Sequence, residues 1–219
     1  MLRRAFVAGL ALLAVAAAPA PQPPRAQPGQ IRVRLVTSMG AITVALDARR
    51  APRTVANFLA YVDDGRLEGT TFYRTARRKT EPTKGFVQGG VGTDARRMLD
   101  PLPLEPTSKT GLKHLNGTIS MAHGPNPNSA SGNFSIMVGD NPGLDARGAN
   151  PGFAAFGQVI GGMDVVQRIL ALPSGGGRDV MKGQMILKPV TIVRAERLDG
   201  VAKPTGRVKP WLLGLKPAG

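Results

Sequence analysis

The sequence predicts a mainly β protein in which short strands form a barrel capped by two helices. Three observations predict this class. Short runs of alternating apolar and polar residues recur along the chain, which is typical of strands with one buried face. The 28 glycines and 19 prolines are spread among these runs and indicate frequent turns. Helical spacing of apolar residues is confined to two isolated segments, which argues against a helical bundle.

The chain has the size of one folded domain with a segment at each end. Its 219 residues and 42% hydrophobic content suffice for a single core. Residues 31–199 carry the strand and helix patterns. Residues 200–219 form a basic tail rich in proline and glycine, which holds the only tryptophan, Trp211. The sequence leaves open whether this tail docks on the domain. Because the chain has no cysteine, packing must stabilise the fold without disulfides.

Residues 1–20 predict a signal peptide. Arg3 and Arg4 form a positive start, residues 5–18 are apolar, and small residues suited to cleavage follow. An uncleaved membrane anchor is the alternative, although the apolar run is short for a bilayer. Residues 21–30, rich in proline and glutamine, are expected to be a disordered linker. We therefore expect an exported protein without a stable membrane anchor, most simply in a bacterial periplasm.

The domain begins with a predicted hairpin and helix. Apolar and polar residues alternate over residues 31–35 and 42–46, with a Ser-Met-Gly turn at residues 38–40. Pro52 suits the first turn of a helix, and Gly65 is placed to end it.

The later elements are mostly short strands. Two β-prone runs, residues 70–73 and 86–87, end at Arg74 and Gln88; the pattern leaves open whether this is an ordinary solvated hairpin or whether the two polar side chains converge. Residues 92–117 are expected to be a loop of turns. Further strands are predicted over residues 117–123, 133–139, 152–160 and 188–198, and a second helix over residues 162–170.

The formal net charge of +15 attracts anionic surfaces in general. The basic residues are scattered, and the longest basic run is Arg77-Arg78-Lys79. No basic helix carries interleaved aromatic residues, so we expect no nucleic-acid binding. Binding to another anionic surface stays open as a weak alternative, and it would weaken as salt rises.

Five short motifs occur in one order along the domain. They are AP-TV-NF--YV--G at residues 51–65, GT-FYR at 69–74, QGG at 88–90, G-ISMA at 117–122 and F-AFG-V--GM-VV at 153–166. Together they resemble the cyclophilin family of peptidyl-prolyl isomerases, over about residues 31–198. The resemblance implies a closed eight-stranded antiparallel β-barrel with a helix over each end. It also implies a monomer that binds proline-containing segments of unfolded or folding proteins.

Isomerisation of an X–Pro bond requires a site that stabilises the twisted amide, because resonance sets a barrier of about 18–20 kcal/mol. As the bond twists, the proline nitrogen becomes basic, and a fixed, always-charged donor stabilises it without proton transfer. No metal or cofactor is needed. The resemblance places Arg74 at the catalytic arginine and Gln88 at the glutamine that orients it. For an isolated arginine, a solvated strand end is the simpler interpretation.

The resemblance also implies a set of substrate-binding residues, namely Phe86, Met121, Ala122, His123, Phe134, Leu144 and Phe153. For the large apolar members taken alone, core packing is the simpler interpretation. The chain departs from the family pattern where Gly85, Ser135 and Gly143 replace pocket aromatics. These departures predict a shallower proline pocket and weaker or altered activity.

Two functions of different classes follow. The first is an isomerase that assists the folding of exported proteins. The second is a peptide-binding or chaperone module of the same fold with little or no turnover, which the thinned pocket favours. The positions of Phe86, Phe134 and Phe153 relative to Arg74 decide whether an aromatic ring lies beside the guanidinium.

Overall fold

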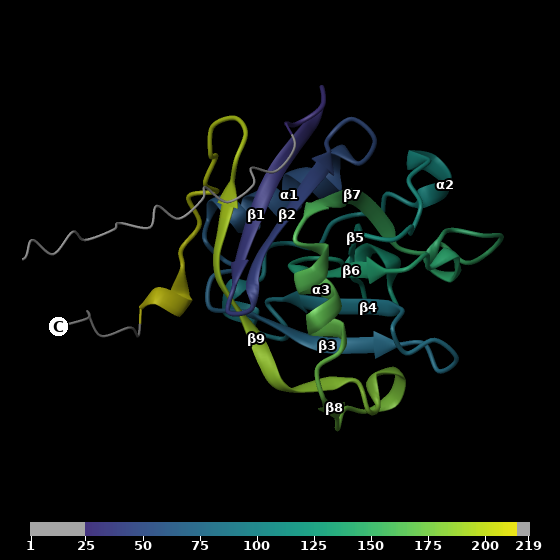
Figure 1. The fold of residues 1–219 in the computed structure, drawn as a ribbon. Helices are drawn as coiled ribbons and strands as arrows, with labels where there is room; N and C mark the ends of the chain where they lie inside the picture. The colour runs from purple at the N-terminus through teal and green to yellow at the C-terminus, as the bar shows by residue number, and fades with distance from the viewer. Residues whose placement is uncertain (1–24, 214–219) are drawn as a thin grey trace, which may run out of the picture.

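A computed structural model describes residues 25–213, and eight of its strands close into an antiparallel barrel (Figure 1). Around the barrel the strands follow the order β1, β2, β7, β5, β6, β4, β3 and β9, and β9 pairs with β1. Their bounds are β1 Gln30–Thr37, β2 Gly40–Asp47, β3 Thr71–Arg77, β4 Gly85–Gly90, β5 Thr118–Met121, β6 Asn133–Val138, β7 Ala154–Gly161 and β9 Met185–Arg197. A two-residue strand, β8 (Ser174–Gly175), pairs with β9. The predicted fold class is confirmed.

Two helices cover the barrel, as the sequence predicts. α1 (Pro52–Asp63) packs against β2, β7 and β9, and α3 (Met163–Leu170) packs against β2, β3, β4 and β6. Pro52 occupies the first turn of α1, where the missing N–H costs no helical hydrogen bond. A third helix, α2 (Thr107–Thr110), has four residues and lies in the segment expected to form only turns.

An aromatic cluster fills the barrel interior. The ring of Phe58 on α1 lies edge to face with that of Phe134 on β6, with 5.3 Å between centroids. The Phe134 ring lies 5.6 Å from that of Phe72 on β3 in the same arrangement. Side chains alternate between the two faces of a strand. Because these residues point inward, the residues next to them in the sequence point to the outer face of the barrel. The core therefore fixes which side chains of β3, β4 and β6 are available for a site.

Several predicted boundaries shift. β3 and β4 both extend past the expected runs, so Arg74 and Gln88 lie within strands and not at their ends. The last strand begins at Met185, three residues before the predicted start. The predicted signal peptide, residues 1–20, lies outside the described residues, as do residues 21–24 of the predicted linker. Over residues 25–213, no helix is both long and apolar enough to cross a bilayer.

The C-terminal tail docks on the domain as far as it is described. Trp211 is 8% exposed and lies over two guanidinium groups, with its ring 4.8 Å from Cζ of Arg66 and 5.1 Å from Cζ of Arg97. The backbone N–H of Thr205 donates to Asp64 Oδ1 at 2.7 Å, and that of Lys203 donates to Asp63 Oδ2 at 2.9 Å. The two aspartates at the end of α1 thus anchor the tail.

Candidate active site

A β-bulge brings Arg74 to the outer face of the barrel. Phe72 pairs with Gly89 and Arg74 pairs with Gln88, so Tyr73 has no partner on β4. Without this extra residue, strict alternation after the buried Phe72 would turn Arg74 inward. A bulge re-aims the side chains that follow it. As a result, Arg74 lies directly opposite Gln88 on the outer face.

Three oxygens hold the Arg74 guanidinium. Its NH1 donates to Gln88 Oε1 at 2.9 Å, and its Nε donates to Gln184 Oε1 at 2.8 Å. A longer bond of 3.3 Å joins NH2 to the carbonyl oxygen of Val180. All three acceptors are neutral, so the positive charge is oriented but not neutralised.

The surroundings of Arg74 are partly desolvated. Burial lowers the pKa of its guanidinium below the ordinary value, although a guanidinium stays protonated in proteins. Burial also raises the pKa of the neighbouring Tyr73 phenol to about 12. The phenol is therefore protonated at neutral pH and donates to Asn133 Oδ1 at 3.3 Å. A charged donor in a partly desolvated site acts more strongly on a nearby lone pair than one in water.

Phe86 is the aromatic residue beside this cation. Cζ of Arg74 lies 5.2 Å from the centroid of the Phe86 ring, and the ring is partly exposed. Gly85, the preceding residue, has φ +142°, and a Cβ there would lie 2.0 Å from the carbonyl oxygen of Ala76. The backbone therefore excludes a larger residue at position 85, and the aromatic group lies one residue further on.

A second aromatic element lies at the end of β5 and the start of β7. The rings of His123 and Phe153 stack, with 4.3 Å between centroids and 20° between planes. His123 Nε2 lies 2.9 Å from the carbonyl oxygen of Gly152. The backbone N–H of Phe153 donates to the carbonyl of Leu144 at 3.0 Å, so these two residues adjoin. His123 thus makes a hydrogen bond to the backbone and also supports the Phe153 ring.

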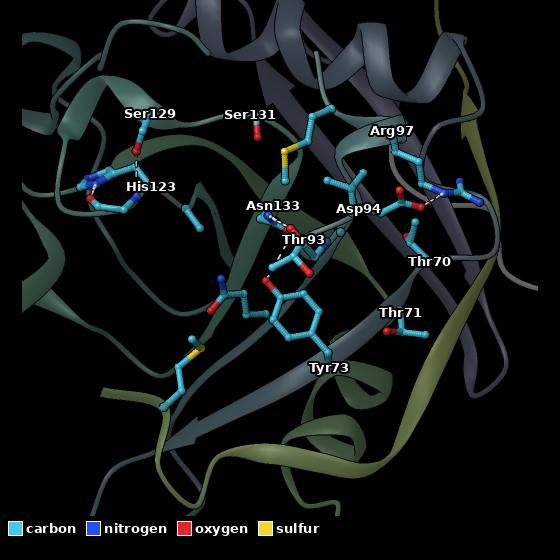
Figure 2. A pocket seen from close by; sticks show the side chains of 18 of the residues that line it. Thr70, Thr71, Tyr73, Thr93, Asp94, Arg97, His123, Ser129, Ser131 and Asn133 are labelled. Atoms are coloured by element: carbon cyan, nitrogen blue, oxygen red, sulfur yellow. Dashed lines mark hydrogen bonds and ion pairs between the residues drawn. The ribbon is translucent and has the colours of Figure 1, made fainter. Parts of the chain in front are cut away.

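A cavity of about 870 Å³ opens beside Gln88 (Figure 2). Tyr73 and Asn133 lie at its floor, His123 and Ser129 at one side, and Thr70 and Arg97 at the other. The full lining also includes Ala122, Met181 and Met185. A groove of this volume next to Arg74 and Gln88 can accept residues that flank a bound proline.

Two expected substrate-binding residues do not reach this face. Met121 is 2% exposed and Phe134 is fully buried. Alternation along β5 and β6 turns both inward, where Phe134 packs against Phe58 and Phe72. For these two residues the structure corrects the expectation of substrate contact: they support the core. The remaining five candidates (Phe86, Ala122, His123, Leu144 and Phe153) are all partly exposed.

A buried Ser–His–Asp chain lies behind the site. His114 Nε2 is 2.8 Å from Ser120 Oγ, and its Nδ1 is 2.7 Å from Asp145 Oδ1. Ser120 is 2% exposed, so its hydroxyl is closed to a substrate. Asp145 follows Leu144, and the chain therefore ties the Leu144 loop to β5. Over the described part of the chain, no cluster of three or more His, Asp or Glu residues could hold a metal ion.

No local sequence pattern identifies Gln184 as a site residue. It follows a run of glycines in a segment with no strand pattern, and only the tertiary structure brings its side chain to Arg74, a residue 110 positions away. The Tyr73–Asn133 contact likewise has no local sequence signal, because it depends on the bulge in β3 and on the neighbouring strands.

Comparisons with known proteins agree with this architecture. A family model described as "Cyclophilin type peptidyl-prolyl cis-trans isomerase/CLD" matches residues 32–197. Peptidyl-prolyl cis-trans isomerase A of Dickeya dadantii (strain 3937) is 39% identical over 139 residues, which cover 63% of this chain and 70% of the relative. Peptidyl-prolyl cis-trans isomerase cyp18 of Streptomyces antibioticus is 36% identical over 170 residues, covering 76% of this chain and 98% of the relative.

Solved structures show the same fold. A crystal structure of a cyclophilin type peptidyl-prolyl cis-trans isomerase of Cryptosporidium parvum, in the presence of the dipeptide Ala-Pro, aligns with a TM-score of 0.61 and 22% identity. The alignment covers 77% of this chain and 99% of that chain.

Proposed function

Since the chain belongs to the cyclophilin-type peptidyl-prolyl cis-trans isomerases, we propose that Arg74 is the residue through which it isomerises X–Pro bonds. The observation that carries this proposal is the Arg74 guanidinium, held by neutral oxygens on the open face beside Phe86. Gln88 orients the guanidinium and borders the groove for the flanking peptide.

The mechanism follows from the electronic structure of the amide. In the planar ground state the nitrogen lone pair is delocalised into the carbonyl group. As the bond twists, the lone pair localises on the proline nitrogen, and a fixed N–H donor of Arg74 stabilises it there. The stabilisation is greater in the twisted state than in either planar state, so it lowers the barrier. No proton is transferred, because arginine does not give up its proton at neutral pH.

The proline ring needs an apolar surface beside Arg74. Phe86 offers its ring beside the guanidinium, and the partly exposed Phe153, which adjoins Leu144, is the second aromatic candidate for a pocket wall. Ser135, which pairs with Gln88 on β6, brings no aromatic ring to the position next to Gln88. This arrangement supports a wider, less complementary proline pocket and a modest rate.

Residues 1–20 support export, and the clients are then proline-containing segments of proteins that fold outside the cytoplasm. The protein acts as a monomer without a stable membrane anchor. Expression of the full chain in a bacterial host, followed by fractionation and N-terminal sequencing, tests this role. We expect a shortened chain in the periplasmic fraction. A full-length chain in the membrane or cytoplasm would contradict export.

A proline-isomerisation assay on a short peptide tests the role of Arg74. Arg74→Ala should lower kcat/KM roughly a hundredfold, as expected when a transition-state donor is removed. Arg49→Ala, which removes an exposed arginine, is the matched control and should keep the wild-type value. Equal rates for wild type and Arg74→Ala would contradict the mechanism.

The alternative is a peptide-binding or chaperone module with little turnover. The observation that favours it is the missing aromatic floor at Gly85 and Ser135. In that case wild type would bind a proline-containing peptide by calorimetry while its isomerisation rate stayed at the uncatalysed background. A measurable rate that depends on Arg74 would exclude this alternative.

A further inference from the structure

We propose that Gln184 is a second positioning residue for isomerisation, acting through Nε of Arg74. The inference rests on the proposed role of Arg74. It adds a residue from the β8–β9 connection to the Arg74–Gln88 pair on β3 and β4, and it explains how the guanidinium is held in one orientation.

The bonds of the guanidinium lead to this inference. Gln88 binds NH1 and Gln184 binds Nε, each within 2.9 Å. One bond alone would leave the planar group free to rotate about it, whereas two bonds on different nitrogens fix its plane. Both acceptors are amide oxygens, which hold a cation without the counter-charge of a carboxylate. The remaining N–H groups then stay available to a substrate.

The backbone around Gln184 is itself fixed. The N–H of Thr75, the residue after Arg74, donates to the Gln184 carbonyl at 2.9 Å. Arg74 also pairs with Met185 across β3 and β9. The backbone of Gln184 is therefore held beside Arg74. Its side chain spans only the distance between two paired strands to reach the guanidinium.

The connection that leads to Gln184 adopts a specialised conformation. Asp179 has φ +51°, and it is the only residue other than glycine with a positive φ among those described. Gly177 has φ +74°, and a Cβ there would lie 2.3 Å from the carbonyl oxygen of Met181. Such backbone is retained where the surrounding structure requires it. Here it also directs the Val180 carbonyl toward NH2 of Arg74.

Because Gln184 orients a group that acts on the twisted amide, its loss should lower kcat more than it changes KM. Gln184→Met keeps the size of the side chain and removes the acceptor. We expect it to lower kcat at least about tenfold, as for loss of one hydrogen bond to a charged group, with an unchanged unfolding temperature. Gln184→Glu keeps the acceptor but adds a counter-charge, and it should also lower kcat.

The deciding experiment is a double-mutant cycle with Arg74→Lys, whose ammonium group has no Nε. In that background Gln184→Met should have little further effect on kcat. Lys182→Ala, in the same connection, is the control and should behave as wild type. Wild-type kcat for Gln184→Met, or an equal loss in both backgrounds, would overturn the inference. Unchanged turnover in Arg74→Ala would instead overturn the proposed function itself.

Discussion

Arg74 and Gln88 face each other directly across β3 and β4, and 2.9 Å separates NH1 of the arginine from Oε1 of the glutamine. The pairing depends on the bulge at Tyr73, which keeps Arg74 on the outer face of the barrel. The guanidinium of Arg74 is therefore held against the outer face of the sheet, within a strand and not at a strand end.

Gln88→Leu should lower kcat/KM of isomerisation roughly tenfold. The substitution removes the acceptor for NH1 and puts an apolar side chain of similar volume in its place, so the loss reflects one charge-assisted hydrogen bond. A peptide assay measures the rate, and circular dichroism checks the fold. A folded variant with the wild-type rate would show that Gln88 does not orient Arg74.

Gly85→Ala should destabilise the protein by at least about 2 kcal/mol, because the new Cβ would meet the Ala76 carbonyl in a left-handed backbone. Gly143→Ala is the matched control, since nothing lies within 4 Å of a Cβ there. Urea unfolding measures both variants. Equal stability of the two would mean that position 85 tolerates a side chain, and that the missing aromatic is not a consequence of the backbone.

Trp211→Ala should lower the free energy of unfolding by about 2–4 kcal/mol, as for a buried aromatic residue. The substitution uncovers Arg66, whose NH2 has no hydrogen-bond partner beneath the ring. Leu213→Ala, at a position that is 80% exposed, should leave stability unchanged.

Wild-type fluorescence provides an independent check on the tail, because Trp211 is the only tryptophan. Its emission should shift to the red on unfolding. Emission typical of a solvated indole in the folded protein would contradict docking.

The stability of the protein should fall as the pH drops below about 6.5. Burial lowers the pKa of His114 from its ordinary value of 6.5, and Asp145 offsets this only in part. The unfolded chain then takes up a proton at a higher pH than the folded chain. Stability is therefore lost on acidification, from pH 6.5 down through the pKa of the folded state.

His114→Gln tests this assignment. The variant should be less stable than wild type at pH 8, because it lacks the buried hydrogen bonds to Ser120 and Asp145. It should lose less stability than wild type between pH 7 and pH 5. Identical losses over this interval would assign the acid sensitivity to other groups.

The sequence by itself determined the class of fold and the two capping helices, and its motifs singled out Arg74 and Gln88 as site residues. These features depend on local signals: alternation in strands, helical spacing after Pro52, and five motifs in a characteristic order. Such signals act within a few residues, and a single sequence records them directly.

Only the tertiary structure decided that Met121 and Phe134 belong to the core, because a side chain's face depends on register and bulges that no local pattern specifies. The same holds for Gln184, which reaches Arg74 because β9 pairs with β3. It also holds for Trp211, which docks because Asp63 and Asp64 at the end of α1 bind the backbone of the tail. Each of these contacts joins residues far apart in the chain. Long-range packing stabilises them, and no local sequence preference predicts them.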